Sequence, residues 1–232
     1  MTLLELEGVH TYYGESHILQ GVDLEVGDDE VVALLGRNGV GKTTTLRSIL
    51  QLTPPAEGSI RFKGEELVGK DTYEVAEAGI GWIPEERRMF NRLSVEENLR
   101  AAVPTAAGVA EGLELAYDTF PILEERAGQR AGDLSGGQQQ MLAIARGLVG
   151  QNELLLVDEP SEGLAPKIVT DVGEALLSAS ASVPILLIEQ KLGLALDLAD
   201  RYYVMDHGEI IDRGETAGVT ADDEQLRRYL SA

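Results

Sequence analysis

Apolar and polar positions along the chain predict an alternation of strands and helices. Continuous apolar runs stand within 30–36, 153–160 and 183–190, and such runs are typical of strands that are covered on both faces of a sheet. A helical pattern follows the first run at 42–52, and another separates the other two runs near 166–180. Strands that alternate with helices in this way predict an α/β fold with a largely parallel sheet.

Shorter strands are expected elsewhere in the chain. Segments with strand-like patterns lie at 3–9, 22–26, 58–64, 79–86 and 201–214. The first two alternate like half-buried strands, and the last one resembles a hairpin. These segments predict an antiparallel β edge beside the parallel core.

A helical block interrupts the alternation at 94–150. Within it, the stretch VPTAAGVAEG at 103–112 predicts a loop between helices, because it holds a proline and two glycines. A last helix is expected at about 222–231. We interpret the whole chain, 1–232, as one domain with an inserted helical subdomain at about 94–150.

The composition narrows the class of protein. The 232 residues include 40 acidic and 19 basic ones, a net charge of −21, which excludes a general nucleic-acid binder because such proteins need a basic surface. The absence of cysteine excludes disulfides and thiolate chemistry. Without a long apolar span or a signal-peptide pattern, the chain is expected to be soluble and intracellular. The large negative charge leads to the hypothesis of a salt-loving source, since salt screens its self-repulsion.

The strongest chemical signal is GRNGVGKTT. It matches the phosphate-loop pattern G-x-x-x-x-G-K-[ST] and stands between an expected strand and an expected helix. Its glycines let several backbone N–H groups point at one anion, and the helix N-terminus adds its dipole. The candidate nucleotide-binding residues of this loop are Gly36, Arg37, Asn38, Gly39, Val40, Gly41, Lys42, Thr43 and Thr44. Lys42 would bind the outer phosphates, and the hydroxyl of Thr43 would bind Mg²⁺.

Two acids end a later apolar run, LLLVDEP. Asp158 and Glu159 would stand at the carboxyl end of a strand, where open α/β sheets bind ligands. Asp158 is a candidate Mg²⁺ ligand through water. Glu159 is a candidate general base that polarises an attacking water.

A third motif, LSGGQ, precedes an amphipathic helix and offers a second helix N-terminus suited to an anion. With the phosphate loop before it and LLLVDEP after it, the chain resembles the ABC-type ATPases along essentially its whole length. The resemblance implies an ABC-type P-loop NTPase fold, ATP and Mg²⁺ as cofactors, and ATP held between two ATPase domains. The signature residues that would contact the partner's nucleotide are Leu134, Ser135, Gly136, Gly137 and Gln138. A monomer should then bind ATP but hydrolyse it poorly, and SEGLAP (161–166) resembles the loop that communicates across the dimer.

The resemblance also assigns roles to single residues. Tyr13 resembles the aromatic that stacks on adenine, with Tyr12 as the other candidate. Glu85 stands where the family usually has a glutamine, and it would coordinate Mg²⁺ or water as a charged ligand. Gln190 stands where the family usually has a switch histidine, so it can hydrogen-bond a γ-phosphate but cannot carry a proton. For Glu189 we expect only a role in steadying the turn.

The motifs also resemble one branch of the family. IPEERRMF, LIEQ and DEPSEGLAP look like the smaller ATP-binding subunit of branched-chain amino-acid importers, while YYGESHILQG and GRNGVGKTT also resemble the urea-importer ATPase. The resemblance implies a second ATPase subunit, like or unlike this one, two membrane permeases, and an extracellular substrate-binding protein. It implies a place on the inner face of the cell membrane, with the permeases docked on the helical block near RLSVEENLR.

Other classes fit the motifs less well. A GTP-binding switch would leave LSGGQ unexplained, and the chain has no N-K-x-D base-reading motif. Chromosome and DNA-repair ATPases insert long coiled coils before the signature, whereas the chain sustains no heptads there. Non-transport regulatory ABC proteins generally join two ATPase domains, whereas one set of motifs is found here.

Overall fold

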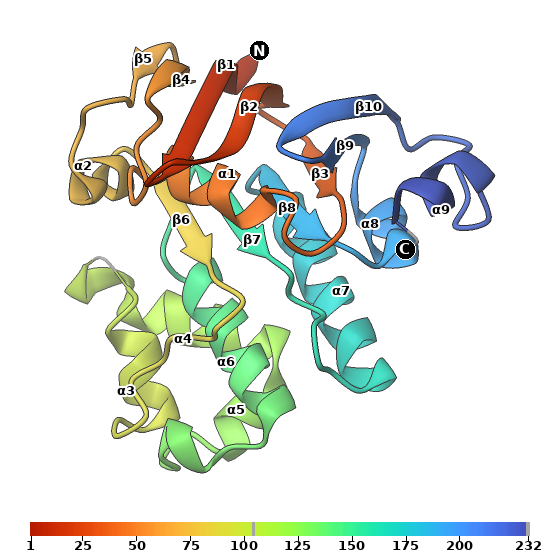
Figure 1. Cartoon of the computed structure of the whole chain (residues 1–232). Helices are drawn as coiled ribbons and strands as arrows, with labels where there is room; N and C mark the ends of the chain where they lie inside the picture. The colour runs from red at the N-terminus through yellow and green to blue at the C-terminus, as the bar shows by residue number, and fades with distance from the viewer. Residues whose placement is uncertain (104, 231–232) are drawn as a thin grey trace.

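The structure, a computed structural model, describes residues 1–103 and 105–230, and its strands form two sheets (Figure 1). The strands are β1 (Thr2–Tyr13), β2 (Ser16–Gly27), β3 (Val31–Leu35), β4 (Glu57–Phe62), β5 (Glu65–Glu66), β6 (Ile80–Ile83), β7 (Leu154–Asp158), β8 (Ile185–Glu189), β9 (Arg201–Asp206) and β10 (Glu209–Glu215). The larger sheet has the order β10-β9-β3-β8-β7-β6, and the smaller one has the order β2-β1-β4-β5.

The larger sheet is parallel from β9 to β6, as the apolar runs predict. Only its edge strand β10 runs antiparallel, paired with β9. The rest of the antiparallel structure forms the separate smaller sheet, whose described pairs are all antiparallel. The α/β class with a mostly parallel core is therefore confirmed, and most of the antiparallel β structure forms a layer of its own.

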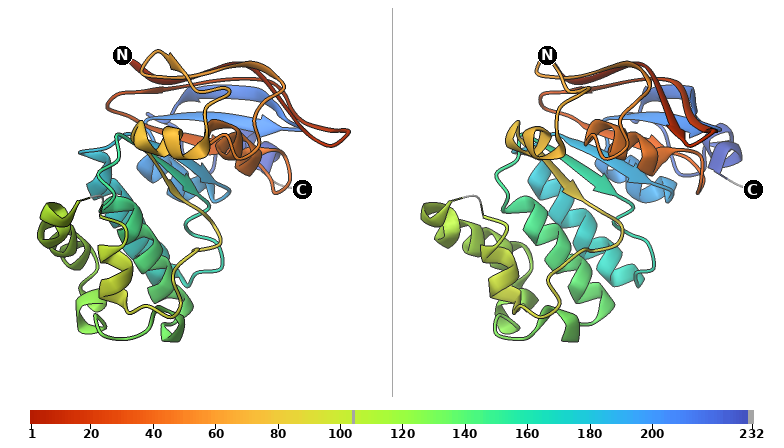
Figure 2. Two further views of the ribbon diagram at one scale, coloured as in Figure 1. Left: turned by 90° about the vertical axis from the view of Figure 1, so that its left-hand side faces the viewer. Right: turned by 60° about the vertical axis from the view of Figure 1, so that its left-hand side comes forward.

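The helices cover both faces of the larger sheet (Figure 2). They are α1 (Lys42–Ile49), α2 (Thr72–Glu77), α3 (Val95–Arg100), α4 (Val109–Thr119), α5 (Pro121–Glu125), α6 (Gly136–Leu148), α7 (Pro166–Ser180), α8 (Leu192–Leu198) and α9 (Glu224–Leu230). In both views of Figure 2 the smaller sheet and α1 lie on one side of the larger sheet, and α6 and α7 lie on the other.

Side-chain alternation along the central strands divides the core in two. Val32 and Leu34 of β3 pack with α1 and the smaller sheet. Ala33 and Leu35 face the opposite way, into the core formed with the helices α3 to α8. All five residues of β3, β7 and β8 are buried, which explains why these strands appear as continuous apolar runs rather than alternating ones.

The helical block departs from the prediction in one place. The expected loop at 103–112 already contains a short 3₁₀ turn at Ala106–Gly108, and α4 begins at Val109. The turn is capped by Thr105, whose hydroxyl accepts a hydrogen bond from the Gly108 amide. The glycines of this stretch led to the expectation of a loop, because glycine favours turns over helices. Gly112 is nevertheless buried inside α4, where it allows close packing: a Cβ added at this position would press on Val103. Residue 104 of this stretch and residue 231 of the last predicted helix lie outside the described residues.

Among the described residues, the search for membrane-crossing helices gave none: every helix is too short or too polar to span a bilayer.

Candidate functional site

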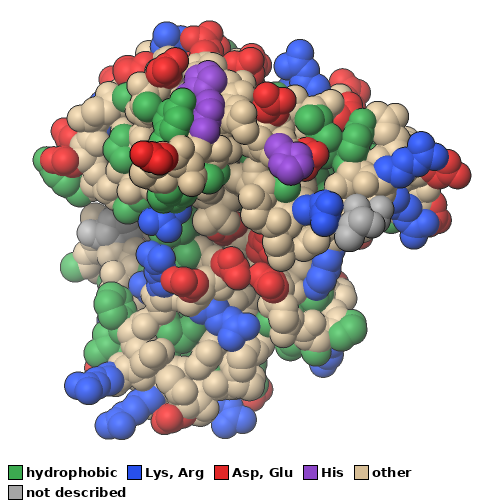
Figure 3. Space-filling model, viewed as in Figure 1, with side chains coloured by type: hydrophobic (Ala, Val, Ile, Leu, Met, Phe, Trp, Pro, Cys, Tyr) green, Lys and Arg blue, Asp and Glu red, His purple; other side chains and the backbone are tan. Residues whose placement is uncertain are grey.

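A cavity of about 320 Å³ lies beside the carboxyl ends of β3 and β7. Its lining residues are Tyr13, Ile18, Asn38, Gly39, Gly41, Lys42, Thr43, Thr44, Glu85, Glu159 and Glu162. All but two of them were predicted from the sequence. In Figure 3 the molecule is hollowed between its upper and lower parts, and acidic side chains gather in the hollow.

The phosphate loop joins β3 to α1 and lines the cavity at Asn38, Gly39 and Gly41. Gly39 and Gly41 have φ values of 83° and 120°, in the left-handed region that other residues avoid. Gly41 precedes α1 and supplies no side-chain cap. The first amides of this eight-residue helix are therefore free to bind an anion, and the helix dipole favours one there.

Lys42 is held in the middle of this loop. Its Nζ donates hydrogen bonds to the carbonyl oxygens of Gly36 (2.8 Å) and Arg37 (2.9 Å), and lies 3.0 Å from Oε1 of Glu159. The lysine is only 4% exposed. An anion that binds in the loop would compete with Glu159 for this ammonium group, and so would free the carboxylate to contact other groups.

Asp158 ends β7 directly beneath the loop and is 2% exposed. The hydroxyl of Thr43 donates to its Oδ1 over 3.3 Å. Burial raises the pKa of Asp158 to about 6, and the nearby charge of Glu159 adds to the shift, while Thr43 and Lys42 oppose it. A hydroxyl and a carboxylate side by side are oxygen ligands of the kind that Mg²⁺ takes in phosphate-binding sites, where phosphate and water complete its shell. Among the described residues, no group of three or more His, Asp or Glu side chains is placed to hold a metal ion.

Glu159 follows Asp158 in a strained conformation. Its φ is 44°, which is uncommon outside glycine and asparagine and typical of positions under functional constraint. Its amide donates to the carbonyl oxygen of Ile188 over 3.0 Å, and its carbonyl oxygen accepts from the amide of Glu162 over 3.2 Å. The backbone is therefore fixed on both sides of the side chain that reaches Lys42.

Glu85 enters the cavity from the segment after β6 and faces Glu162. A hydrogen bond with Glu162 raises the pKa of Glu85 to about 7, with further contributions from burial and from the charges of Glu159 and Asp158. Glu162 was not among the predicted site residues, although it lies in the SEGLAP segment. The only available signal was its distance of three residues from Glu159 in a tight turn.

Tyr13 lines the cavity and is 43% exposed, with its hydroxyl 3.3 Å from the hydroxyl oxygen of Thr53. Tyr12 instead stacks on His17, with ring centroids 4.2 Å apart. Of the two tyrosines, Tyr13 is therefore the one available to a ligand in the cavity. Ile18, the other lining residue that the sequence did not indicate, lies in β2 before the strand segment expected at 22–26.

The signature segment lies away from this cavity. Ser135 caps α6: its hydroxyl accepts from the amide of Gln138 over 3.3 Å, and the Gln138 side chain accepts from the Ser135 amide over 3.1 Å. Leu134 is buried, while Gly136 lies close to the guanidinium of Arg87 and Gly137 close to Ile168. None of the residues 134–138 lines the cavity, so within one chain the structure does not bring the signature to the phosphate loop.

Gln190 follows β8, the strand between β3 and β7, but its side chain is not part of the cavity lining. The preceding Glu189 is 2% exposed. Its Oε1 accepts the amides of Gln190 (2.8 Å) and Lys191 (3.0 Å). The expectation that Glu189 steadies this turn agrees with these contacts.

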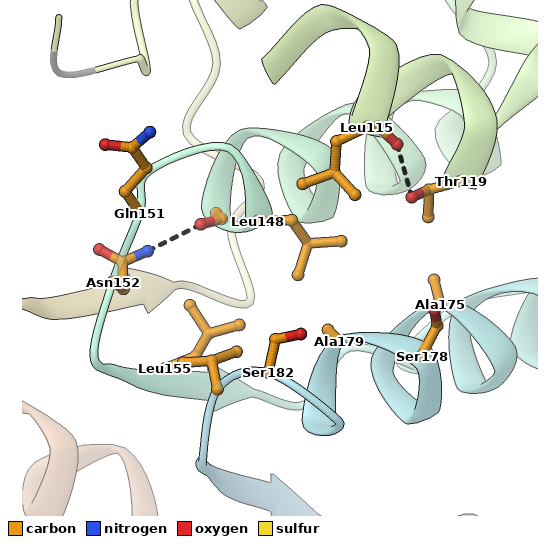
Figure 4. Close-up of a pocket in the computed structure, with 12 residues that line it drawn as sticks. Leu115, Thr119, Leu148, Gln151, Asn152, Leu155, Ala175, Ser178, Ala179 and Ser182 are labelled. Carbon is orange, nitrogen blue, oxygen red and sulfur yellow. Dashed lines mark hydrogen bonds between the residues drawn. The ribbon is translucent and has the colours of Figure 1, made fainter. Parts of the chain in front are cut away.

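A different cavity, of about 300 Å³, lies between α4, α6 and α7 (Figure 4). Its lining includes three leucines and two alanines, and two of its polar groups are already engaged. Asn152 donates to the carbonyl oxygen of Gly147, and Thr119 to that of Leu115. None of its lining residues was predicted as a site residue, and it offers no charged group, so it is not the candidate site.

Comparisons with known proteins agree with this geometry. A family model described as ABC transporter matches residues 19–162. The high-affinity branched-chain amino acid transport ATP-binding protein BraG of Pseudomonas aeruginosa is 41% identical over 231 residues, which cover 98% of this chain and 99% of that protein. The chain belongs to the ABC transporter family. It is therefore a nucleotide-binding ATPase subunit of the ABC type.

Other relatives of this ABC ATPase support the assignment. The probable branched-chain amino acid transport ATP-binding protein LivF of Archaeoglobus fulgidus is 34% identical over 220 residues, with 93% of each chain covered. A solved ATP-binding subunit of an ABC transporter matches 99% of the chain with a TM-score of 0.84 at 27% identity, over the full length of that structure. An ATP-binding cassette in its ADP conformation matches all of both chains with a TM-score of 0.81 at 28% identity.

The carboxylate pair in this ABC ATPase predicts a pH-dependent stability. Glu85 has a pKa of about 7 in the folded chain against 4.5 for the free side chain, so its favourable contribution is fully present below about pH 4.5 and is lost as the pH rises through about 7. Glu85→Gln removes this loss. We expect the melting temperature of the nucleotide-free variant to exceed that of the wild type clearly at about pH 8 and little at about pH 5.

The matched control is Glu86→Gln, because Glu86 lies on the same segment but pairs with Arg88 outside the cavity. If the difference in melting temperature between Glu85→Gln and the wild type did not change with pH, the raised pKa of Glu85 in its contact with Glu162 would be contradicted.

Proposed function

We propose that this ABC ATPase drives the import of branched-chain or other hydrophobic amino acids. The observation that carries the cargo assignment is the 41% identity to BraG over nearly the full length of both chains. The 34% identity to LivF, whose name states the same cargo, supports this assignment further. The assignment of ATP hydrolysis rests instead on the phosphate-loop cavity, whose chemistry does not depend on the cargo.

In the proposed cycle, the loop residues 36–44 bind the phosphates of ATP and Tyr13 stacks on the base. Mg²⁺, held by Thr43, Asp158 and Glu85, would neutralise charge that develops on the phosphates. Phosphate binding releases Glu159 from Lys42, and the carboxylate then accepts a proton from the attacking water. Gln190 orients the γ-phosphate by hydrogen bonding. The 3.0 Å contact between Lys42 and Glu159 supports this sequence of partners.

A second ATPase subunit, identical or different, would complete the site by placing its own residues 134–138 against the nucleotide. The separation of the signature from the cavity in one chain supports this arrangement. ATP would then favour the closed dimer because it contacts both subunits only when they are closed. Residues 94–150 would move as a helical subdomain during closure.

Each of the two permease subunits would dock on one ATPase subunit, at the helical block near RLSVEENLR and at a groove of about 510 Å³ between the sheet core and that block. The groove is lined in part by Trp82, Arg87, Arg88 and Arg146. The indole Nε1 of Trp82 and the Nε of Arg146 are buried there without a partner among the described residues. Basic residues are outnumbered about two to one by acidic ones in this chain, so the grouping of three arginines favours a permease segment with acidic side chains. The chain would then lie on the inner face of the cell membrane, and an extracellular binding protein would deliver the cargo.

The catalytic step can be tested with Glu159→Gln. We expect this variant to bind ATP but to hydrolyse it at least about 10²-fold more slowly, because an amide cannot accept the proton of the attacking water. The dimer should then accumulate with ATP, which size-exclusion chromatography with bound nucleotide measures. Lys42→Ala is the control that should lose nucleotide binding itself. Wild-type turnover in Glu159→Gln would show that another group is the base.

The cargo can be tested by transport. Cells of the source organism that carry Lys42→Ala should lose uptake of labelled leucine, isoleucine and valine, because the ATPase no longer binds the nucleotide that drives transport. Uptake of labelled urea serves as the comparison. If urea uptake fell while amino-acid uptake stayed normal, the cargo assignment would be wrong although the ATPase assignment would stand. Permease and binding-protein genes beside this one would give independent support.

The charge of −21 supports a source that accumulates salt. We expect the free energy of unfolding to rise between about 0.1 M and about 3 M KCl, since the distance over which charges repel falls several-fold over this range. Denaturation by urea at each salt concentration measures it. Equal stability at both concentrations would contradict the proposal of a salt-loving source.

A further inference from the structure

The end of β8 is built around a buried carboxylate. Glu189 is the last residue of this strand, between β3 and β7, and it is 2% exposed. One of its oxygens, Oε1, accepts the amides of both Gln190 and Lys191. Its other oxygen, Oε2, is buried without a partner among the described residues. An ordinary strand end does not need an ionisable side chain, so the burial of this one calls for a reason.

Glu189 determines the direction that the chain takes after β8. Two amides that converge on one carboxylate oxygen hold the peptide planes of Gln190 and Lys191 in fixed orientations. Lys191 then precedes the first turn of α8. The Gln190 side chain and the Lys191 side chain therefore both leave the backbone in directions that depend on Glu189.

Lys191 connects the turn after β8 to the loop that follows the neighbouring strand β7. Its Nζ donates to the carbonyl oxygen of Ser161 over 2.8 Å. Ser161 is fully buried and lies in the turn that Glu159 and Glu162 close by their own backbone hydrogen bond. The link therefore reaches a point two residues after Glu159.

The turn that carries Glu159 is thus attached at two points, one on β8 and one just after it. The amide of Glu159 is bound to the carbonyl oxygen of Ile188, and the carbonyl oxygen of Ser161 is bound to Lys191. Two attachments on either side of a residue fix its rotation, whereas one leaves it free to tilt. Glu159 has an uncommon positive φ, and such a conformation persists only where the surroundings hold it.

We propose that Glu189 and Lys191 are positioning residues for hydrolysis: together they hold the Glu159–Glu162 turn and Gln190 in a fixed relation to the phosphate loop. The proposal rests on the roles given to Glu159 and Gln190 in the proposed function. Neither positioning residue lines the cavity. They act on the chemical step rather than on nucleotide binding, because small errors in the position of a base reduce the rate steeply.

The test measures ATP hydrolysis by the full chain at high protein concentration, with ATP binding and melting temperature measured on the same samples. In Lys191→Met the stem of the side chain stays and the donor is lost. We expect kcat to fall about tenfold, the effect of losing one hydrogen bond from a charged group, while KM for ATP changes less than about twofold. Lys191→Arg, which keeps a donor, should recover most of the rate.

Glu189 is tested by a matched pair of variants. Glu189→Gln keeps an oxygen that can accept both amides and should retain most of the wild-type kcat. Glu189→Leu removes the acceptor and should lower kcat as Lys191→Met does. Because the two residues act on one turn, the double variant Glu189→Leu/Lys191→Met should be little slower than the slower single variant.

Lys70→Met is the control for lost positive charge, because among the described residues the ammonium group of Lys70 bonds only to Glu65 and Lys70 does not line the cavity. It should leave kcat and KM unchanged. Wild-type kcat in Lys191→Met, or an equal loss in Lys70→Met, would overturn the proposal. So would a fall in kcat that comes only with a matching rise in KM, since that would place Lys191 in nucleotide binding. A wild-type chain that binds ATP without hydrolysing it would instead show that a different ATPase subunit has to complete the site, and the same variants would then be compared with that subunit added.

Discussion

The buried ion pair between Lys42 and Glu159 is the constraint on which the rest of the site depends. The charged atoms lie 3.0 Å apart, with the side chains only 3% and 10% exposed, and removing one partner of such a pair costs about 3–5 kcal/mol. The parallel sheet makes the pair possible, because β3 leads into the loop that carries Lys42 and β7 ends one residue before Glu159. A bound phosphate would replace Glu159 as the partner of Lys42, so that nucleotide binding and release of the carboxylate are one exchange.

Around this pair the site carries more negative charge than it can neutralise alone. The pKa values of Asp158 and Glu85 are both raised, the first chiefly by burial and the second chiefly by its contact with Glu162. Raised acid pKa values mean that the ionised, nucleotide-free site opposes folding at neutral pH. A cation that binds there with nucleotide would remove the penalty, so the site is expected to be stabilised strongly by its ligand.

Residues of the candidate site could be located from the sequence wherever they lie together in one short continuous segment. The phosphate loop and the two acids at the end of β7 could be located because strand, turn and helix follow one another within a few residues. Glu162 could not, since its contact with Glu85 depends on how its turn packs against a distant segment. Tyr13 was named ahead of Tyr12 only by resemblance, and the structure places Tyr13 in the cavity lining while Tyr12 stacks on His17. The start of α4 was missed for a related reason, because the packing of Gly112 against Val103 overrides its weak helix propensity.

Glu85 and Gln190, the two residues that depart from the usual ABC pattern, bear on the proposed mechanism in the same direction. A glutamine at position 190 cannot carry a proton, so the proton of the attacking water has to pass to Glu159 or to the phosphate itself. A glutamate at position 85 adds negative charge to a site that already contains Asp158 and Glu159, and so makes the balance of charge more dependent on Lys42. Less of the catalysis can then come from proton transfer, and more has to come from the placement of Glu159. The attachment of its turn to Ile188 of β8 and to Lys191 just after it is where the structure supplies that placement.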